Sequence, residues 1–357
     1  MKILLAGGGT LGSVNPLIAM YEEAKKQHKS WDWFWVGTRS GIERSLIGPL
    51  SIGYEWVPAI KLRRYFSLRV LVDPFFLALA FLRSLLIVMV EKPDVIIGAG
   101  SFVSVPVIWA GWLFRKKIII HQQDIRPTLS NKLCAPFASK ITVSFKKSLE
   151  DFPKAKAEWI GNPARDALKE ANPLAAASEF HFDATLPVVL ITGGSSGAEA
   201  LNAWVWKHLL SLTRAANVVH LAGRGKMDPS QTHERYRQVE FLGPLMPHAL
   251  AAADLAITRG GIGTITELGH LRKAAIIIPM PGTHQEDNAF YCLRERAAVV
   301  YRQDQLDETV VRRVRELLES PEKREALGRA LAGLLKEGAR ERMVNIIASL
   351  GGSPAVI

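Results

Sequence analysis

The chain has 357 residues, of which 48% are hydrophobic and 22% are charged, and its formal net charge is +11. This composition excludes a disordered chain, and the length allows two ordinary domains. The positive charge favours an anionic partner. Because no zinc-finger, recognition-helix or RNA-binding signature is present, we do not expect that partner to be a nucleic acid. Cys134 and Cys292 lie far apart in the sequence and indicate neither a disulfide framework nor a metal site, which fits a reducing cytosol.

The chain opens with an apolar run that leads into glycines, KILLAGGGTLG from Lys2. This run is too short for a signal peptide and predicts a strand, a glycine turn and a helix. A second segment of the same design, PVVLITGGSSGAEALN, begins at Pro187. Each segment is typical of the start of a doubly wound α/β domain, so we predict two Rossmann-like domains.

Further apolar runs predict the other strands, with helical stretches between them as a parallel sheet requires. These strands are expected at 31–37, 94–100, 117–123, 140–145, 217–223, 239–243, 255–261 and 274–281. We place the domains at 1–163 and 164–339 and expect a C-terminal helix, about 340–357, to pack back on the first. The Arg- and Glu-rich stretch at about 307–350 is predicted to pack across both domains.

Residues 61–92 are both apolar and basic. Their apolar run from Phe75 to Val90 contains Arg83 and is shorter than the roughly 20 residues of a spanning helix. The segment WAGWLFRKK at 109–117 repeats the combination of aromatic and basic residues. An apolar surface rimmed by cations suits an anionic bilayer, so we predict peripheral membrane contact. The alternative is a helix buried against the sheet.

The segment TRGGIGTITELGH at 258–270 carries the clearest chemical signal. Its glycines allow backbone amides to approach a ligand, and a helix that begins near Ile262 attracts phosphate through its free N–H groups. Thr264 adds a hydroxyl group, and Glu267 can accept hydrogen bonds from a ribose diol. The alternative is a glycine turn with a capping threonine and a solvated glutamate.

Three other segments supply polar groups of the same kind. ITGGSSGAEALN offers amides with Ser195 and Ser196, GNPAR offers Arg165 as a charge partner, and GTHQEDNA is expected to form a polar loop with sugar-binding side chains. No Asp-x-Asp pair, Walker lysine or His-Glu-x-x-His motif is present, so we expect a metal-independent protein without a cofactor. A departing diphosphate would then be stabilised by amides, helix dipoles and arginines.

These motifs resemble the MurG-like family of bacterial glycosyltransferases, in the order in which that family carries them. The matching segments are GGTLGSVNP (8–16), GAGSFVSVPVIWAG (98–111), HQQDIRPTLSNK (121–132), GNPARD (161–166), ITGGSSGAEALN (191–202), LAAADLAITRGGIGTITEL (250–268) and HQEDNA (284–289). The resemblance implies a GT-B fold, with UDP-N-acetylglucosamine on the C-terminal domain, a polyprenyl-diphosphate-linked muramyl acceptor on the N-terminal domain and an interdomain cleft.

The resemblance also implies an inverting hexosyltransferase that converts lipid I to lipid II with a β-1,4 bond, in peptidoglycan precursor synthesis. Such an enzyme serves cell wall biogenesis, cell shape and cell division, as a peripheral protein on the cytoplasmic face of the bacterial inner membrane. Its membrane contacts would be 61–92 and 109–117. Two alternatives remain open: a transferase or epimerase with another substrate, and a membrane-docked nucleotide-sugar binder without catalysis. A nicotinamide dehydrogenase is less favoured, because neither opening gives G-x-G-x-x-G with a distant acidic residue.

Site residues follow from the resemblance position by position. The implied donor-binding residues are Thr10, Leu11, Gly12, Asp124, Arg165, Ser195, Leu242, Ile262, Gly263, Thr264, Ile265, Thr266, Glu267 and Gln285. The implied acceptor-binding residues are Thr10, Gly12, Ser13, Gly100 and Asn131. No metal ligand is expected.

The chain departs from the family at three places. Ser13 stands where the family usually has a histidine, Gln122–Asp124 replace Glu-Gln-Asn, and residues 282 and 283 replace acidic residues. An inverting transfer needs a group that takes the acceptor's proton, and a serine hydroxyl cannot do so unaided. We therefore predict Asp124 as the general base, because a carboxylate appears there as the histidine is lost.

Overall fold

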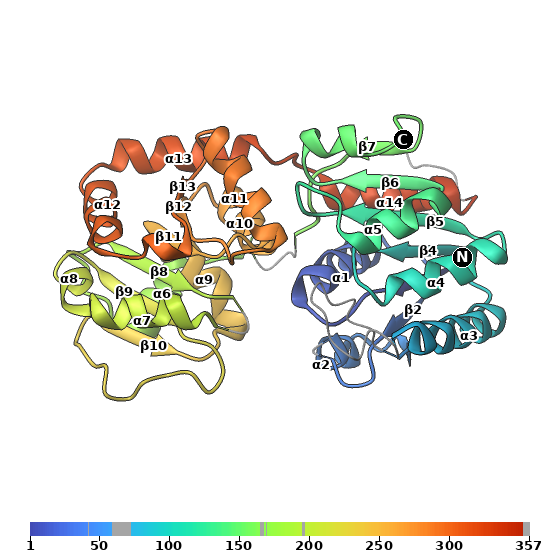
Figure 1. The fold of residues 1–357 in the computed structure, drawn as a ribbon, viewed down its shortest axis with the longest axis horizontal. Helices are drawn as coiled ribbons and strands as arrows, with labels where there is room; N and C mark the ends of the chain where they lie inside the picture. The colour runs from blue at the N-terminus through green and yellow to red at the C-terminus, as the bar shows by residue number, and fades with distance from the viewer. Residues whose placement is uncertain (42, 59–72, 165–167, 169, 195–196, 353–357) are drawn as a thin grey trace. The chain divides into compact units, whose positions relative to one another are not determined.

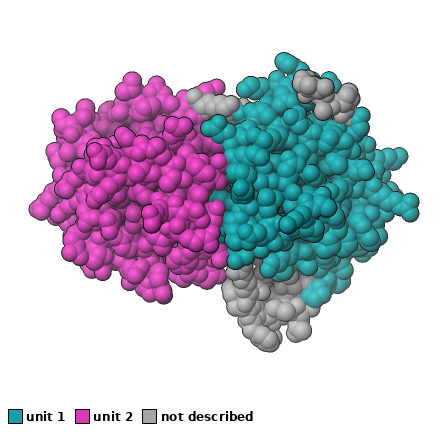
Figure 2. Space-filling view, turned by 90° about the horizontal axis from the view of Figure 1, so that it is seen from above, with its two compact units in different colours: residues 1–165, 336–357 teal, residues 166–335 magenta. Residues whose placement is uncertain are grey.

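The structure is a computed structural model that describes residues 1–357 except 42, 59–72, 165–167, 169, 195–196 and 353–357. The chain divides into two compact units, shown in teal and magenta in Figure 2. Unit 1 comprises residues 1–165 and 336–357, and unit 2 comprises residues 166–335. The sequence-based boundaries, 163/164 and 339/340, differ from these by a few residues.

In the described part of the chain, unit 1 holds a parallel seven-stranded sheet in the order β3-β2-β1-β4-β5-β6-β7 (Figure 1). Its strands are β1 (Lys2–Ala6), β2 (Asp32–Gly37), β3 (Gly53–Trp56), β4 (Val95–Gly98), β5 (Lys117–Gln122), β6 (Lys140–Val143) and β7 (Ala157–Trp159). The residues of β4 are all buried, which is why this strand appears as a continuous apolar run in the sequence.

Helices cover both faces of this sheet. Successive strand residues point to opposite faces, so neighbouring residues of one strand belong to different core clusters. Ile3 and Leu5 belong to one core cluster, and Leu4 and Ala6 belong to another. The helices are α1 (Leu11–Lys26), α2 (Glu43–Ile47), α3 (Asp73–Glu91), α4 (Ser104–Leu113), α5 (Leu129–Cys134) and α14 (Ala339–Leu350). The first cluster includes residues of α1 and α14, and the second includes residues of α3 and α4.

The C-terminal helix α14 packs on α1 within unit 1. Met343, Val344 and Ile347 are fully buried in the cluster that holds α1. Arg340 and Glu23, both nearly buried, lie 3.5 Å apart as an ion pair between the two helices. The last described helix therefore belongs to the unit in which the chain begins.

Unit 2 repeats the architecture with a sheet in the order β10-β9-β8-β11-β12-β13. Its strands are β8 (Val188–Thr192), β9 (Asn217–Leu221), β10 (Tyr236–Val239), β11 (Leu255–Thr258), β12 (Ala274–Ile277) and β13 (Val299–Val300). Its helices are α6 (Pro173–Phe180), α7 (Glu199–Lys207), α8 (Leu209–Thr213), α9 (Met246–Ala252), α10 (Ile262–His270), α11 (His284–Arg294), α12 (Glu308–Leu318) and α13 (Pro321–Gly333).

The stretch at about 307–350, which was predicted to pack across both domains, contributes helices to both units. It forms three helices, of which α12 and α13 belong to unit 2 and α14 belongs to unit 1. Gly338, with a φ of +72°, precedes α14 and takes a left-handed conformation that glycine adopts without steric cost. The chain therefore changes units close to this residue.

The strand order reverses at one position in each sheet. In unit 1 the strand β1 lies between β2 and β4, and in unit 2 the strand β8 lies between β9 and β11. In open parallel sheets, ligands bind outside the carboxyl ends of the strands at such switch points. The loops that follow β1, β4, β8 and β11 are therefore the first places to look for a site, and they include the glycine segments singled out in the sequence.

Candidate active site

The two switch-point loops of unit 1 are bonded to each other. Ser101, which follows β4, accepts a hydrogen bond from the Gly8 amide (3.3 Å) and donates its hydroxyl to the Gly8 carbonyl (2.9 Å). Gly9 has a φ of +86°, and a Cβ at this position would lie 2.8 Å from the Phe102 ring. The loop after β1 thus has one shape, which depends on glycine and on the neighbouring loop.

Glu43 is fully buried, and its carboxyl group contacts this loop. It accepts hydrogen bonds from the Gly9 amide (3.1 Å), the Thr38 amide (2.7 Å) and the Thr38 hydroxyl (2.5 Å). A Cβ on Gly8 or Gly41 would lie 2.4 Å or 2.2 Å from its oxygens. The Gly9 amide is therefore already bonded and does not face a ligand. Glu43 was not among the residues predicted from the sequence, where its signal is an acidic residue in a glycine-rich turn after a strand.

Ser13 closes the same loop rather than offering a base. Its side chain is 7% exposed, and its hydroxyl lies 3.2 Å from the carbonyl oxygens of Gly8 and Thr10. Thr10 is the N-cap residue of α1, and the helix begins at Leu11. A Cβ at Gly12 would meet only the Thr10 hydroxyl at 3.7 Å, so the first turn of α1 leaves room beside the backbone.

The loop after β5 places Asp124 at the carboxyl edge of the sheet. The Gln122 side-chain amide donates to the backbone carbonyls of Asp124 and Arg126, both at 2.8 Å. Asn131 in turn donates to the Gln122 side chain (2.6 Å) and to the His121 carbonyl (3.1 Å). Asn131 is 1% exposed, so it acts on the shape of this loop. Asp124 is 8% exposed.

A buried polar cluster lies beneath this loop. The His121 ring nitrogens lie 3.0 Å from the Thr142 hydroxyl and 3.1 Å from the Asn162 side-chain oxygen. Burial lowers the pKa of His121 to about 4, so the ring is neutral at pH 7. The cluster connects β5 and β6 with Asn162, and His121 itself is fully buried.

In unit 2, the predicted donor residues gather at the carboxyl edge of the central strands. Thr192, Thr258 and Ile277 pair in register, so the loops that follow β8, β11 and β12 leave the same edge. The helix α10 begins at Ile262, and a Cβ on Gly261 or on Gly263 would meet nothing within 4 Å. The first turn of α10 is therefore open to an anion.

The first turns of α11 pack against the glycine turn before α10. Contrary to the predicted polar loop, His284, Gln285 and Asn288 lie in a helix. Asn288 donates to the Gly260 carbonyl (3.0 Å), and a Cβ on Gly260 would lie 2.4 Å from the Gln285 carbonyl oxygen. The Gln285 side chain accepts from the Met280 amide (3.0 Å). Gln285 thus stands beside the turn that opens α10.

Arg259, which the sequence analysis did not single out, holds two loops of this edge together. Its guanidinium is 5% exposed and donates to the Ile278 carbonyl (3.1 Å) and to the Gln303 side chain (2.8 Å). Desolvation lowers the pKa of Arg259. The loop after β12 is thereby fixed to the end of β11.

The remaining predicted residues differ in their burial and in the strands that they follow. Leu242 is buried and follows β10, at the far side of the sheet from β11, while its neighbour Phe241 is 61% exposed. Gly100, with a φ of +80°, follows β4. Thr264 and Glu267 are half-buried, and Ile265 and Thr266 are buried. Arg165 and Ser195 lie outside the described residues. Among the described residues, no group of three or more His, Cys, Asp or Glu is placed to hold a metal ion.

The chain matches two domain families over most of its length. Residues 3–143 match the glycosyltransferase family 28 N-terminal domain, and residues 188–343 match the glycosyltransferase family 28 C-terminal domain. The chain belongs to glycosyltransferase family 28. The two matched ranges fall in unit 1 and unit 2 respectively, except for the last residues of the second, which reach α14.

Two relatives of this family 28 glycosyltransferase share the same enzyme name. A protein of Bacillus thuringiensis (strain Al Hakam) is 35% identical over 322 residues, which are 88% of this chain and 91% of that protein. A protein of Legionella pneumophila (strain Lens) is 34% identical over 352 residues, 97% of this chain and 96% of that protein. Both are named UDP-N-acetylglucosamine–N-acetylmuramyl-(pentapeptide) pyrophosphoryl-undecaprenol N-acetylglucosamine transferase.

A solved structure agrees with the fold. The crystal structure of Acinetobacter baumannii MurG covers 98% of this chain with a TM-score of 0.74, at 22% identity over 99% of that protein. The predicted fold class, GT-B with two Rossmann-like units, is confirmed. The predicted resemblance and the predicted enzyme class, a glycosyltransferase, are confirmed as well.

Proposed function

We propose that the chain transfers N-acetylglucosamine from UDP-N-acetylglucosamine to an undecaprenyl-pyrophosphoryl-N-acetylmuramyl-pentapeptide, the step from lipid I to lipid II. The observation that carries this proposal is sequence identity. About a third of the aligned residues are identical to those of named transferases, over nearly the whole length of those proteins. The two switch-point edges supply what the reaction needs, an anion-binding helix start in unit 2 and a carboxylate in unit 1.

The donor lies, in this proposal, on the carboxyl edge of the unit 2 sheet. The amides at the open start of α10 hold phosphate, and Glu267, one turn further on, accepts hydrogen bonds from the ribose hydroxyls. Gln285 contacts the sugar from the adjoining turn of α11, and Leu242 lies toward the base. Arg165 and Ser195, which are outside the described residues, flank the phosphates.

The acceptor reacts, in this proposal, at the carboxyl edge of the unit 1 sheet. Its hydroxyl oxygen attacks the anomeric carbon, the bond from that carbon to UDP breaks, and UDP leaves with the electron pair. The proton of the hydroxyl passes to the Asp124 carboxylate. The arrangement of Gln122 and Asn131 supports this role because it fixes the loop that carries Asp124. Ser13, whose hydroxyl lies against two carbonyls, shapes the acceptor side of the loop.

We propose that no metal takes part in the departure of UDP. In this proposal the open first turn of α10 and the guanidinium of Arg165, a residue outside the described part of the chain, stabilise the leaving diphosphate instead. Support comes from the sequence, which lacks the acidic pair that holds a divalent ion on a diphosphate.

The protein binds, in this proposal, to the surface of an anionic membrane through α3. One described helix, Pro74–Glu91, is long and apolar enough to cross a membrane by length and composition alone. One side of it packs in the core through Ala80, Ile87 and Val88. Arg83 pairs with Glu55 (2.9 Å) and lies 3.8 Å from the centre of the Trp56 ring. These contacts support a helix docked on unit 1 with its other side on the bilayer.

The exposed side of α3 is apolar throughout. Its large exposed side chains are Phe75, Phe76, Leu79, Leu82, Leu86, Met89 and Val90, and the end of α4 adds Trp112 and Leu113. Lys92, Arg115 and Lys117 are exposed near the ends of α3 and α4. An apolar face flanked by cations suits an anionic lipid surface. The side of the membrane on which it binds is expected to be the cytoplasmic one.

Release of UDP tests the reaction. Purified protein is incubated with UDP-N-acetylglucosamine and a soluble analogue of the muramyl acceptor, with EDTA in one arm. We expect release of UDP that requires the acceptor and is unchanged by EDTA. Binding of UDP without release would favour a non-catalytic binder, and release of an altered free sugar without acceptor would favour an epimerase.

A further inference from the structure

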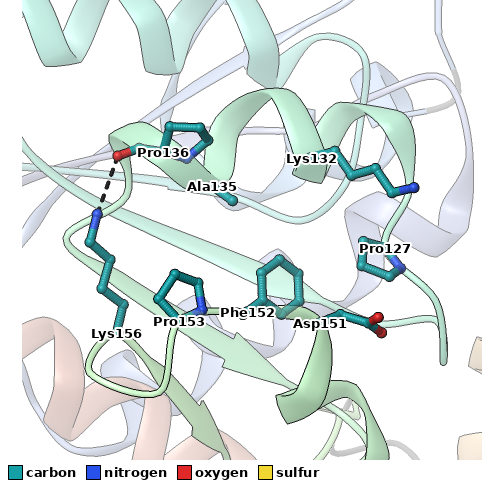
Figure 3. A pocket seen from close by; sticks show the side chains of 8 residues that line it. All are labelled: Pro127, Lys132, Ala135, Pro136, Asp151, Phe152, Pro153 and Lys156. Carbon is teal, nitrogen blue, oxygen red and sulfur yellow. Dashed lines mark hydrogen bonds between the residues drawn. The ribbon is translucent and has the colours of Figure 1, made fainter.

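A trough on the surface of unit 1 lies outside the residues assigned above. It has a volume of about 410 Å³ and lies between α5 with the following turn and the chain at 151–156 (Figure 3). Its walls are Pro127, Ala135, Pro136, Phe152 and Pro153, with Lys132, Asp151 and Lys156 around them. A volume of this size is in the range of ligand pockets.

The trough begins close in sequence to Asp124, the predicted general base. Pro127 follows β5 and is three residues from Asp124, a separation of at most about 11 Å along the chain. Lys156 immediately precedes β7, so it lies at the opposite, amino edge of the sheet. The trough therefore leads from the proposed site of reaction along the side of unit 1.

Its charge is positive. The Asp151 carboxylate pairs with the Arg126 guanidinium at 3.2 Å, which leaves the two lysines as the net charge of the trough. Within the described parts of the chain, neither Lys132 nor Lys156 forms an ion pair, and the Lys156 ammonium donates to the Pro136 carbonyl (3.2 Å). In Figure 3 the two ammonium groups lie at opposite ends of the trough, with apolar side chains between them.

We propose that this trough binds the peptide part of the acceptor, with Lys132 and Lys156 contacting its carboxylates. The inference rests on the proposed function, which makes a muramyl pentapeptide the acceptor. A free peptide chain ends in a carboxylate, and its backbone and apolar side chains suit walls of proline and phenylalanine. The peptide would leave the reacting sugar near Asp124 and enter the trough at Pro127.

A single phosphate or diphosphate fits this trough less well. Such groups need donors that converge on one point, whereas these two cations stand apart at the ends of an apolar wall. A short peptide with carboxylates separated by apolar atoms matches both the charges and the wall. The lysines are thus expected to determine specificity for the acceptor, without a part in the chemical step.

Two acceptors that differ only in the peptide test the inference. The Michaelis constant is measured for the muramyl-pentapeptide acceptor and for the same lipid-linked sugar without peptide. In a Lys132→Ala/Lys156→Ala variant we expect the constant for the peptide acceptor to rise about three- to tenfold, the range of two partly exposed ion pairs. The ratio of the two constants, which favours the peptide acceptor in the wild type, should approach one in the variant.

Lys154→Ala is the matched control, because this lysine is exposed and does not line the trough. An equal rise for both acceptors in the double variant would overturn the inference, and so would a wild type that does not distinguish them. If the wild type transfers sugar to neither acceptor, the proposed function fails and the inference fails with it. Transfer to both acceptors alike overturns the inference alone.

Discussion

At the scale of single residues, Ser13 and Asp124 lie at the same edge of one sheet but differ in chemistry. Ser13 lies against the carbonyls of Gly8 and Thr10 inside the glycine loop. Asp124 brings a carboxylate, on a loop whose backbone carbonyls accept hydrogen bonds from the Gln122 side-chain amide. A catalytic proton acceptor must be basic near the working pH, so the carboxylate is the better candidate.

The Asp124→Asn substitution tests this assignment. It keeps the size of the side chain and removes its basicity, so we expect kcat to fall by about two to four orders of magnitude. The Michaelis constant for UDP-N-acetylglucosamine should change less than about twofold, because Asp124 acts on the acceptor. Steady-state kinetics of both substrates measure the effect. Asp32→Asn, at an exposed position where β2 begins, is the control, and normal turnover of Asp124→Asn refutes the assignment.

Glu43 is expected to matter for both stability and acceptor binding. Glu43→Ala leaves the Gly9 and Thr38 donors without their buried acceptor, so we expect the free energy of unfolding to fall by about 1–3 kcal/mol. The loosened glycine loop should raise the Michaelis constant of the acceptor more than that of the donor. Urea unfolding and steady-state kinetics check both effects.

Glu43→Gln and an exposed control complete this comparison. The glutamine keeps one oxygen but turns an amide nitrogen toward existing donors, so it should also be destabilising. Glu316→Gln, at an exposed position of α12, should leave stability within about 0.5 kcal/mol. A Glu43→Ala protein with wild-type stability and kinetics would contradict the assigned role.

At the scale of elements, β5 and β9 each bury a neutral histidine. Burial lowers the pKa of His121 and of His220 to about 4, from about 6.5 in an unfolded chain. The unfolded state therefore binds more protons between these values. The stabilising contribution is complete above pH 6.5 and is lost as the pH falls toward 4, by about 3 kcal/mol for each histidine.

Urea unfolding at pH 7, 5.5 and 4 measures this loss. We expect stability to fall across the series, and His121→Gln and His220→Gln should each remove part of the dependence. His181→Gln, at an exposed position after α6, should leave the pH dependence as it is. A wild type whose stability is flat between pH 7 and 4 would contradict the buried neutral state.

The exposed face of α3 makes a second prediction at this scale. Leu82 and Leu86 are each 58% exposed on the side opposite the core. A Leu82→Glu/Leu86→Glu variant should bind anionic vesicles at least about tenfold more weakly, because each leucine side chain contributes about 1.5–3 kcal/mol when fully buried. Co-sedimentation with the vesicles measures the binding. Leu174→Glu/Leu210→Glu, with comparable exposure in unit 2, is the control, and equal binding of both variants would contradict a membrane role for α3.

The buried strands could be predicted from the sequence, and the more exposed strands at the sheet edges could not. Strands such as β8 are buried at every position and almost entirely apolar, because both faces of the sheet are covered. The strands β3, β7 and β13 lie at sheet edges, are two to four residues long and lack such a run. The strand β10 lies at 236–239 instead of the predicted 239–243, because its half-buried residues give a weak pattern.

The candidate site was predictable where glycine turns follow strands, since the requirement for close backbone approach is local. The contacts of Glu43 and Arg259 could not be predicted, because they join residues that only the folded chain brings together. The 284–288 segment was expected to be a loop because of its polarity. Thr283, whose hydroxyl caps the start of α11 by accepting from the Gln285 amide, explains why it is a helix.

At the scale of the whole molecule, the chain consists of two similar units, and the proposed function assigns the donor to unit 2 and the acceptor to unit 1. Each sheet reverses its order at one strand, and a glycine turn that leads into a helix follows β1 in unit 1 and β11, the neighbour of β8, in unit 2. The family 28 domains match these units in order along the chain. The central claim is therefore that a sugar held by unit 2 is transferred, with inversion, to an acceptor held by unit 1.

The product of a single reaction tests this claim most directly. UDP-N-acetylglucosamine labelled at its anomeric carbon is incubated with the protein and a lipid-linked muramyl-pentapeptide acceptor, and the lipid product is analysed by nuclear magnetic resonance. The account predicts label in the lipid fraction, on one added sugar with a β configuration at the labelled carbon. Label that stays in water-soluble sugar, or an α configuration in the lipid product, would contradict it.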